Sequence, residues 1–226
     1  MIGLIGGMSW RSTELYHRHL NEAAEAKGGL HANARSIIIS LLYADLLGFA
    51  RAGDWTRVGD MIGEALRQAE AAGATLGLMT AVTPHRLFDV LAAKSPIPLL
   101  HVLDPAIEAL SGSGVTQVGL LGTSYTLDTP AFSAMFVRAG LRIIRPSAQQ
   151  CQTLDGIIQS ELTTGLVNKL SNRRVASIAR DLVERGAEVI LLACTELPLL
   201  DWHSFDAAAV IDVTRLHAEA ALKACR

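Results

Sequence analysis

The residue of this sequence that is best suited to chemistry is Cys194, in the segment LLACTELP at residues 191–198. The apolar run predicts a buried strand, and the cysteine stands where that strand ends. Thr195 and Glu196 follow at an expected helix start, where the first backbone N–H groups have no partner within the helix and favour a thiolate. A cysteine in a strand is commonly inert, but its place at the strand end favours an acid/base role for Cys194.

The segment around the cysteine is part of an internal repeat. LMTA at residues 78–81 corresponds to LLAC at residues 191–194, and each follows a Gly-Ala pair a few residues earlier. GLIG at residues 3–6 likewise recurs as GLLG at residues 119–122, where a strand runs into a glycine turn and then a helix. Two similar α/β halves predict a pseudo-symmetric pair of domains with a cleft between them.

The repeat predicts where a ligand binds. In open parallel sheets, ligands bind beyond the carboxyl ends of the strands. Ala81 and Cys194 both follow such ends, so we expect them to face each other across the cleft. We place the first domain at residues 1–99 plus 209–226 and the second at residues 100–208.

The elements that must position these residues alternate between short apolar runs and helical patterns, which predicts mainly parallel sheets with helices on both faces. The first helix is expected to be capped by Ser12 or Thr13, and a later one by Asp54. Strands are expected at residues 2–5, 36–42, 76–79, 98–102, 115–121, 141–144 and 189–193. Helices are expected at residues 12–26, 55–72, 85–93, 129–139, 155–167 and 172–185.

Composition restricts the class of protein further. Half of the 226 residues are hydrophobic and 19% are charged, which is enough apolar material for a packed core. A net charge of −2 gives no reason to expect nucleic acid or an anionic membrane as a partner. No apolar run approaches the roughly 20 residues that cross a bilayer, and the N-terminus lacks a signal-peptide pattern. Three widely spaced cysteines make neither a disulfide framework nor a metal cluster. We expect a cytoplasmic protein.

Four segments carry a resemblance to a known family: GGMSW at residues 6–10, GLLGT at 119–123, CTELP at 194–198 and DVTRLHA at 212–218. In this order and spacing they resemble the aspartate/glutamate racemases over essentially the whole chain. The resemblance implies two similar α/β domains, a homodimer, a small amino acid or carboxylic acid as substrate, and no pyridoxal phosphate. It also implies that a thiolate removes the α-proton on one face of the substrate and a thiol returns a proton on the other.

The sequence departs from that family at the first base. The usual motif is Cys-Asn-Thr-x-His, or Thr-Asn-Thr-x-His, whereas this chain has AVTPH at residues 81–85. Thr83 and His85 match, but Ala81 cannot carry a proton. Three explanations stay open: an engineered inactivation, a natural single-base variant, or a register in which Thr80 or Thr83 acts.

Val82 in place of the asparagine argues against engineering alone, and it predicts a more apolar site wall. Relatives of the family that decarboxylate use one cysteine opposite a small residue. Three functions therefore stay open. They are racemisation of an amino acid of the aspartate/glutamate type, decarboxylation or isomerisation by Cys194 alone, and carboxylate binding without catalysis.

Further site residues follow from the two glycine turns and from the resemblance. The N–H groups of the two turns, at residues 6–9 and 122–124, could bind a substrate carboxylate, with Gly7 and Met8 as the candidates in the first turn. Thr83, Thr123 and Thr195 are candidate substrate contacts. Glu196 either tunes Cys194 or favours the helix start by its charge. Arg51 and Lys169 lie near the family's cationic positions but match poorly, and we expect surface charges there.

Two histidines complete the candidates. His85 is either a proton relay beside Ala81 or a packing residue, with packing favoured. His217 lies on an alanine-rich helical segment, where a packing role is also expected.

Overall fold

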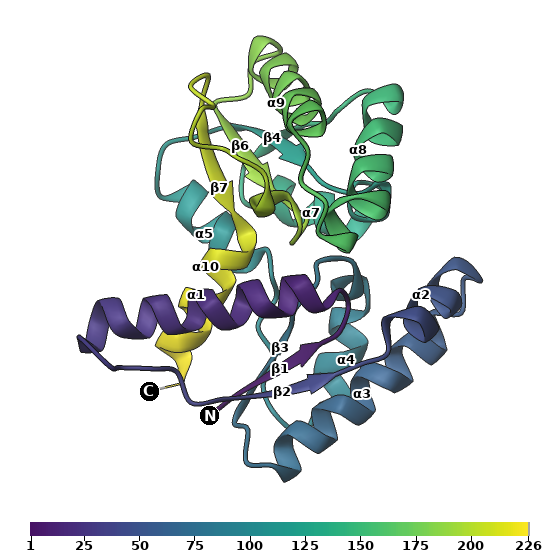
Figure 1. Cartoon of the computed structure of the whole chain (residues 1–226), viewed down its shortest axis with the longest axis vertical. Helices are drawn as coiled ribbons and strands as arrows, with labels where there is room; N and C mark the ends of the chain where they lie inside the picture. The colour runs from purple at the N-terminus through teal and green to yellow at the C-terminus, as the bar shows by residue number, and fades with distance from the viewer. Residues whose placement is uncertain (226) are drawn as a thin grey trace. The chain divides into compact units, whose positions relative to one another are not determined.

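The computed structural model describes residues 1–225 and divides into two compact units (Figure 1). Unit 1 contains Met1–Val102 together with the chain from Thr214 onward, and unit 2 contains Leu103–Val213. Each unit holds one parallel sheet with helices packed on it. The expected fold class, two similar parallel-sheet α/β domains, is therefore confirmed.

The sheet of unit 1 has the strand order β2-β1-β3, with all pairs parallel. Its strands are β1 (Ile2–Gly6), β2 (Ser36–Ser40) and β3 (Leu76–Met79). Its helices are α1 (Trp10–Gly28), α2 (Tyr43–Arg51), α3 (Trp55–Ala71), the 3-10 helix η1 (Thr83–Leu87), α4 (Phe88–Lys94) and α10 (Val213–Ala224).

Alternation along β1 explains why helices cover both faces of this sheet. Ile2 and Leu4 point to one face, where they pack with Tyr16 of α1 and Ala218 of α10. Ile5 points to the other face, where it joins a cluster built largely from α3 and α4. A strand that is buried on both faces has a continuous apolar sequence, and this is why these strands could be predicted.

The sheet of unit 2 has the order β5-β4-β6-β7, again all parallel. Its strands are β4 (Gln117–Leu121), β5 (Arg142–Ile144), β6 (Val189–Leu192) and β7 (Ala209–Asp212). Its helices are α5 (Asp104–Ser111), α6 (Ser124–Leu127), α7 (Pro130–Arg138), α8 (Ala148–Ser160), η2 (Leu162–Thr164), α9 (Lys169–Glu184) and η3 (Leu197–Leu199). Ile190 and Leu192 of β6 pack with α8 and α9 in one apolar cluster.

The internal repeat has the same topology in both units. In each sheet the first strand of the unit lies between the second and the third, as β2-β1-β3 and as β5-β4-β6. Thr80 N–H donates to Ile5 O at 3.0 Å just past β3, and Ala193 N–H donates to Leu121 O at 2.7 Å just past β6. The two strand ends named in the repeat are therefore equivalent in backbone structure.

Several expected boundaries differ from the observed ones. The strand expected at residues 98–102 is reduced to one bridge between Leu99 and Gly77. The helix expected from residue 155 begins at Ala148, because Ser147 and Gln150 form a capping box there. The first helix begins at Trp10 with Ser9 as its N-cap, so the expectation of Ser12 or Thr13 was wrong.

The boundaries between the two units also differ from the boundaries that we predicted. It falls after Val102 rather than after residue 99, and after Val213 rather than after residue 208. The second difference has a simple cause: β7 pairs with β6 and so extends the sheet of unit 2.

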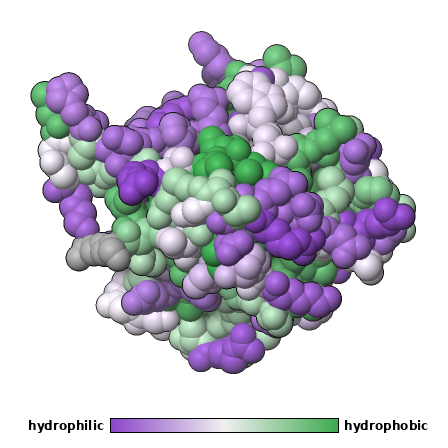
Figure 2. Space-filling model, turned by 90° about the horizontal axis from the view of Figure 1, so that it is seen from below, coloured by the Kyte–Doolittle hydropathy of each residue, from purple (hydrophilic) through white to green (hydrophobic). Residues whose placement is uncertain are grey.

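The surface mixes polar and apolar residues. On the face in Figure 2, hydrophilic residues are spread widely with hydrophobic ones between them. Exposed apolar side chains such as Leu30, Leu42 and Val137 come from distant parts of the sequence, which is usual for a folded protein. Within residues 1–225, we find no helix with the length and apolar character that crossing a membrane requires.

Candidate functional site

Cys194 stands two residues past the end of β6 and is 6% exposed. Its Sγ donates a hydrogen bond to Oε2 of Glu196 at 3.3 Å. The Thr195 hydroxyl donates to the same oxygen at 2.9 Å, and Thr195 and Glu196 are buried as well. The structure therefore brings together the three residues that we singled out in the CTE segment.

The protonation state of Cys194 differs from the expected one. Burial raises the pKa of the thiol well above its usual range, and the negative charge of Glu196 raises it further. The backbone N–H groups of Glu196 and Leu197 lower this pKa, as expected, but they do not outweigh burial. The expected helix start is only the three-residue η3. In this structure Cys194 is thus a thiol hydrogen-bonded to a buried carboxyl group.

Ala81 occupies the equivalent position of unit 1, two residues past the end of β3. It is 8% exposed and belongs to the apolar cluster that also contains Met8 and Met79. Val82 beside it is buried too. The surroundings of Ala81 are therefore as apolar as the Val82 substitution predicted.

His85 is held against this segment. Its Nδ1–H donates to the carbonyl oxygen of Ala81 at 2.9 Å, which closes the turn before η1. Burial, followed by the proximity of His101 and His217, puts the pKa of His85 well below its usual value. The ring is a neutral packing group that positions the Ala81 turn. Thr83 lies at the first position of η1 and is half-buried.

Thr80 is engaged inside unit 1. It is fully buried, and its hydroxyl donates to Ile5 O at 3.3 Å and lies 3.1 Å from Oγ1 of Thr13. The same Thr13 oxygen accepts a hydrogen bond from Gly7 N–H at 3.0 Å. These contacts hold the glycine turn after β1, so Thr80 has a structural role and the Gly7 N–H group already has an acceptor.

The glycine turn of unit 2 is also engaged. Asp155 accepts hydrogen bonds from Ser124 N–H at 2.9 Å and from Ser124 Oγ at 2.5 Å. A carboxylate of the protein thus occupies the start of α6, where we expected a substrate carboxylate. The Thr123 hydroxyl lies 3.4 Å from that of Thr126.

Arg51 and Lys169 are exposed, as expected of surface charges. Arg11 is a cation that our sequence analysis did not consider. It lies in the first turn of α1 directly after the GGMSW motif, and its guanidinium carbon is 4.3 Å from the centre of the Trp10 ring.

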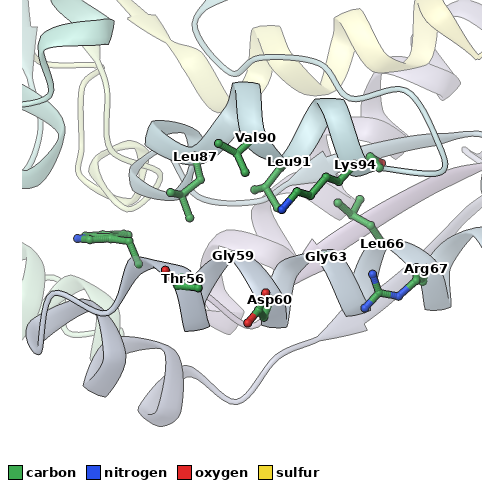
Figure 3. A pocket seen from close by; sticks show the side chains of 12 residues that line it. Thr56, Gly59, Asp60, Gly63, Leu66, Arg67, Leu87, Val90, Leu91 and Lys94 are labelled. Atoms are coloured by element: carbon green, nitrogen blue, oxygen red, sulfur yellow. The ribbon is translucent and has the colours of Figure 1, made fainter.

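A separate groove of about 350 Å³ lies within unit 1, between α3 and the η1–α4 segment (Figure 3). Gly59 and Gly63 form its α3 side, and a side chain added at Gly59 would stand 3.6 Å from Leu87 Cδ1. Leu87, Val90 and Leu91 line the other side. None of the site residues predicted from the sequence lines this groove.

Known structures share this fold. A putative Asp/Glu racemase from Yersinia pestis has a TM-score of 0.88 and 29% identity, with 99% of this chain and 97% of that chain covered. An aspartate racemase homologue from Pyrococcus horikoshii has a TM-score of 0.85 and 27% identity over the same shares. Two parallel-sheet α/β units, each with a repeat-related turn after its third strand, are the fold that this chain shares with these racemase structures.

The chain belongs to the Asp/Glu/Hydantoin racemase family, whose model matches residues 5–221. Among curated relatives, the glutamate racemase of Corynebacterium glutamicum is 26% identical over 109 residues, a match that spans 46% of this chain and 37% of that protein. The family resemblance stated from the sequence motifs is confirmed.

Proposed function

We propose that this chain transfers a proton at the carbon next to the carboxylate of a small amino acid, with Cys194 as its one acid/base residue. Membership of the racemase family supports the type of reaction. The single observation that carries the assignment of Cys194 is its 3.3 Å hydrogen bond to the buried Glu196. The Glu196 carboxylate lies close enough to accept the thiol proton when Cys194 acts as a base.

The proposed steps conserve protons. Glu196 takes the thiol proton, and the Cys194 thiolate then removes the α-proton of the substrate, which becomes a carbanion stabilised by its carboxylate. Cys194, now protonated, exchanges that proton with solvent and returns a proton to the same carbon, and Glu196 gives its proton back to sulfur. The α-proton of an amino acid is very weakly acidic, so the base must be desolvated. The burial of Cys194 and Glu196 meets that need.

Proton exchange is expected from one enantiomer. Inverting the carbon requires a second proton donor on its opposite face, and the repeat-related position holds Ala81. The buried Thr80 hydroxyl is committed to Ile5 and Thr13 and does not replace it. The chain as it stands therefore exchanges the α-proton with retention.

A second candidate is decarboxylation or isomerisation of a small carboxylic acid by Cys194 alone. The observation that favours it is the apolar cluster around Ala81 and Val82, because an apolar wall suits a departing neutral carbon dioxide. In that reaction Cys194 would only deliver a proton to the carbanion left behind. A carboxylate-binding protein without catalysis is the third candidate.

The test is α-proton exchange in deuterated water, followed by NMR on separate L- and D-enantiomers of aspartate and glutamate. The unsubstituted chain is compared with Cys194→Ala and with Cys151→Ala, a matched change at a half-buried cysteine outside the CTE segment. Exchange from one enantiomer that Cys194→Ala abolishes and Cys151→Ala retains supports the proposal. Exchange that survives in Cys194→Ala contradicts it. If no amino acid exchanges, malonate-type acids test the second candidate.

A further inference from the structure

The groove between α3 and the η1–α4 segment has the size and the lining of a small-molecule site. Its volume of about 350 Å³ lies within the range of ligand pockets, which is about 300–1,000 Å³. Gly59 and Gly63 lie one turn apart on the same face of α3, so the helix contributes no side chain there to fill the groove. Leu66 and Leu91 are buried in the lining, which is therefore apolar along much of its length.

Opposite charges stand on the two walls of this groove. Lys94 reaches from α4 toward α3, and Asp60 lies on α3 (Figure 3). Neither side chain forms an ion pair or a hydrogen bond with another group of residues 1–225. Arg67, the other charged residue of the lining, is already paired with Glu64 at 2.6 Å. The groove therefore offers one ammonium and one carboxylate that are free to pair with a ligand.

This combination of groups selects a class of ligand. A simple carboxylate would pair with Lys94 but would be repelled by Asp60, and a simple amine would pair with Asp60 but would be repelled by Lys94. A zwitterion pairs with both groups. An apolar portion of the ligand would remove the leucine side chains of the lining from water. A free amino acid with an apolar side chain has all three parts.

We propose that this groove binds a free amino acid with an apolar side chain, at a site separate from Cys194. Lys94 pairs with the carboxylate of the ligand, and Asp60 pairs with its ammonium group. The apolar side chain of the ligand lies against Leu87 and Leu91. This proposal does not depend on the proposed function, because no residue of the CTE segment takes part in it.

The bound amino acid would contact the segment that follows the Ala81 turn. Leu87 is the last residue of η1, and His85 of the same 3-10 helix donates to Ala81 O at 2.9 Å. A ligand that packs on η1 and α4 restricts their local opening. Binding is therefore expected to slow amide hydrogen exchange in residues 83–94.

The test is calorimetric titration of L-leucine into the Cys194→Ala chain, in which turnover plays no part. Lys94→Gln and Asp60→Asn in that background are each expected to weaken leucine binding about threefold to fivefold, the size of an exposed ion pair. Both residues are exposed, so the variants should fold normally. Lys27→Gln, at an exposed position of α1, is the matched control and should bind leucine as its parent does.

Two analogues of leucine separate the two charges. Isocaproate lacks the ammonium group, so its binding should be weakened by Lys94→Gln and not by Asp60→Asn. Isopentylamine lacks the carboxylate, so its binding should be weakened by Asp60→Asn and not by Lys94→Gln. Responses to the two variants that do not depend on the charge of the ligand would contradict the proposed pairing.

Gly63→Leu should fill the groove. A Cβ at Gly63 would stand 3.9 Å from Arg67 Nη1, an ordinary contact, and replacing a glycine inside a helix should not lower the melting temperature. Leucine binding and the slowed exchange of residues 83–94 are expected to be lost in Gly63→Leu. Both should persist in Gly48→Leu, a change at an exposed glycine of α2.

Three results would overturn the proposal. The first is the absence of a binding heat with leucine in the parent chain. The second is equal leucine affinity in Gly63→Leu and its parent. The third is a dimer, measured by sedimentation, that dissociates in Gly63→Leu, because a second copy of the chain would then cover the groove.

Discussion

The thiol of Cys194 donates a hydrogen bond to Oε2 of Glu196 across 3.3 Å, and the two side chains are both buried. This contact joins a weak acid to a nearby proton acceptor away from bulk water. Burial, followed by the charge and the hydrogen bond of Glu196, raises the pKa of Cys194, so the thiol is held in its neutral form.

Glu196→Gln should therefore separate thiol acidity from turnover. Glutamine removes the negative charge, so the pKa of Cys194 is expected to fall, as followed by the ultraviolet absorbance of the thiolate during a pH titration. Glutamine cannot accept the thiol proton, so α-proton exchange should slow by about 10²-fold or more. Glu184→Gln, at an exposed carboxylate of the same unit, should change neither quantity. Undiminished exchange in Glu196→Gln would remove the carboxylate from the mechanism.

Ala81→Cys should supply the missing partner base. Because Ala81 is the repeat equivalent of Cys194, the new thiol is expected to extend exchange to the second enantiomer and to produce racemisation, measured by chiral chromatography. The site is buried, so the added sulfur should cost about 1–3 kcal/mol of unfolding free energy. Ala93→Cys, at an exposed position of α4, is the control for a cysteine in itself. Exchange that stays restricted to one enantiomer in Ala81→Cys would argue against a racemase ancestry of this site.

Gly7→Ala should destabilise the protein more than Gly53→Ala. Both glycines have a left-handed backbone, with φ of 81° and 75°, which costs an alanine about 1–2 kcal/mol. A side chain at Gly7 would stand 2.1 Å from Leu41 O, whereas one at Gly53 would meet nothing within 4 Å. We expect urea unfolding to show an additional loss of about 2 kcal/mol or more in Gly7→Ala. Equal losses of unfolding free energy in the two variants would mean that the glycine turn after β1 adjusts to the added side chain without cost.

The fold was readable from the sequence because buried parallel strands are continuous apolar runs. The expected strand at residues 76–79 matches β3, and Asp54 caps α3 by accepting from Arg57 N–H, as predicted. The start of α8 was missed although its signal is present, because Ser147 and Gln150 are spaced as a capping box. The strand at residues 98–102 was overpredicted, since an apolar run does not reveal how much of it pairs.

Less of the candidate site could be predicted from the sequence. From the local sequence we predicted that Cys194 lies at a strand end and that the backbone N–H groups after it lower its pKa. Those N–H groups do lower the pKa of Cys194. Burial, which outweighs them, comes from residues of α8 and α9 in the same apolar cluster, such as Leu154 and Ile178. A serine before a helix normally caps it, and only the structure shows that the Ser9 side chain makes no capping hydrogen bond.

Acid should destabilise unit 1 through three buried histidines. His85 lies with its ring centre 5.0 Å from that of His101 and 5.7 Å from that of His217. His217 accepts from the Tyr16 hydroxyl at 2.8 Å and donates to Leu100 O at 3.1 Å, which confirms its packing role. Burial lowers the pKa of His101 to about 4, although Asp89 opposes this, and lowers that of His217 to about 3.

These depressed pKa values fix the sign of the pH dependence. Each ring is neutral in the folded protein, while in the unfolded chain it takes up a proton below about pH 6.5. The stability is therefore complete above that pH and is lost as the pH falls toward about 4 for His101 and about 3 for His217. Each histidine should contribute a slope approaching about 1.4 kcal/mol per pH unit. Urea unfolding across this range measures the slope.

A substitution tests the assignment of that slope. His101→Gln, which cannot take up a proton in either state, should flatten the profile by about one proton between about pH 6 and about pH 4. His17→Gln, at an exposed position of α1, should leave the profile unchanged. The pH dependence comes from elsewhere if His101→Gln and the unsubstituted chain lose stability in parallel. A flattened profile in His101→Gln alone would show that burying a neutral ring, rather than surface charge, limits the stability of unit 1 in acid.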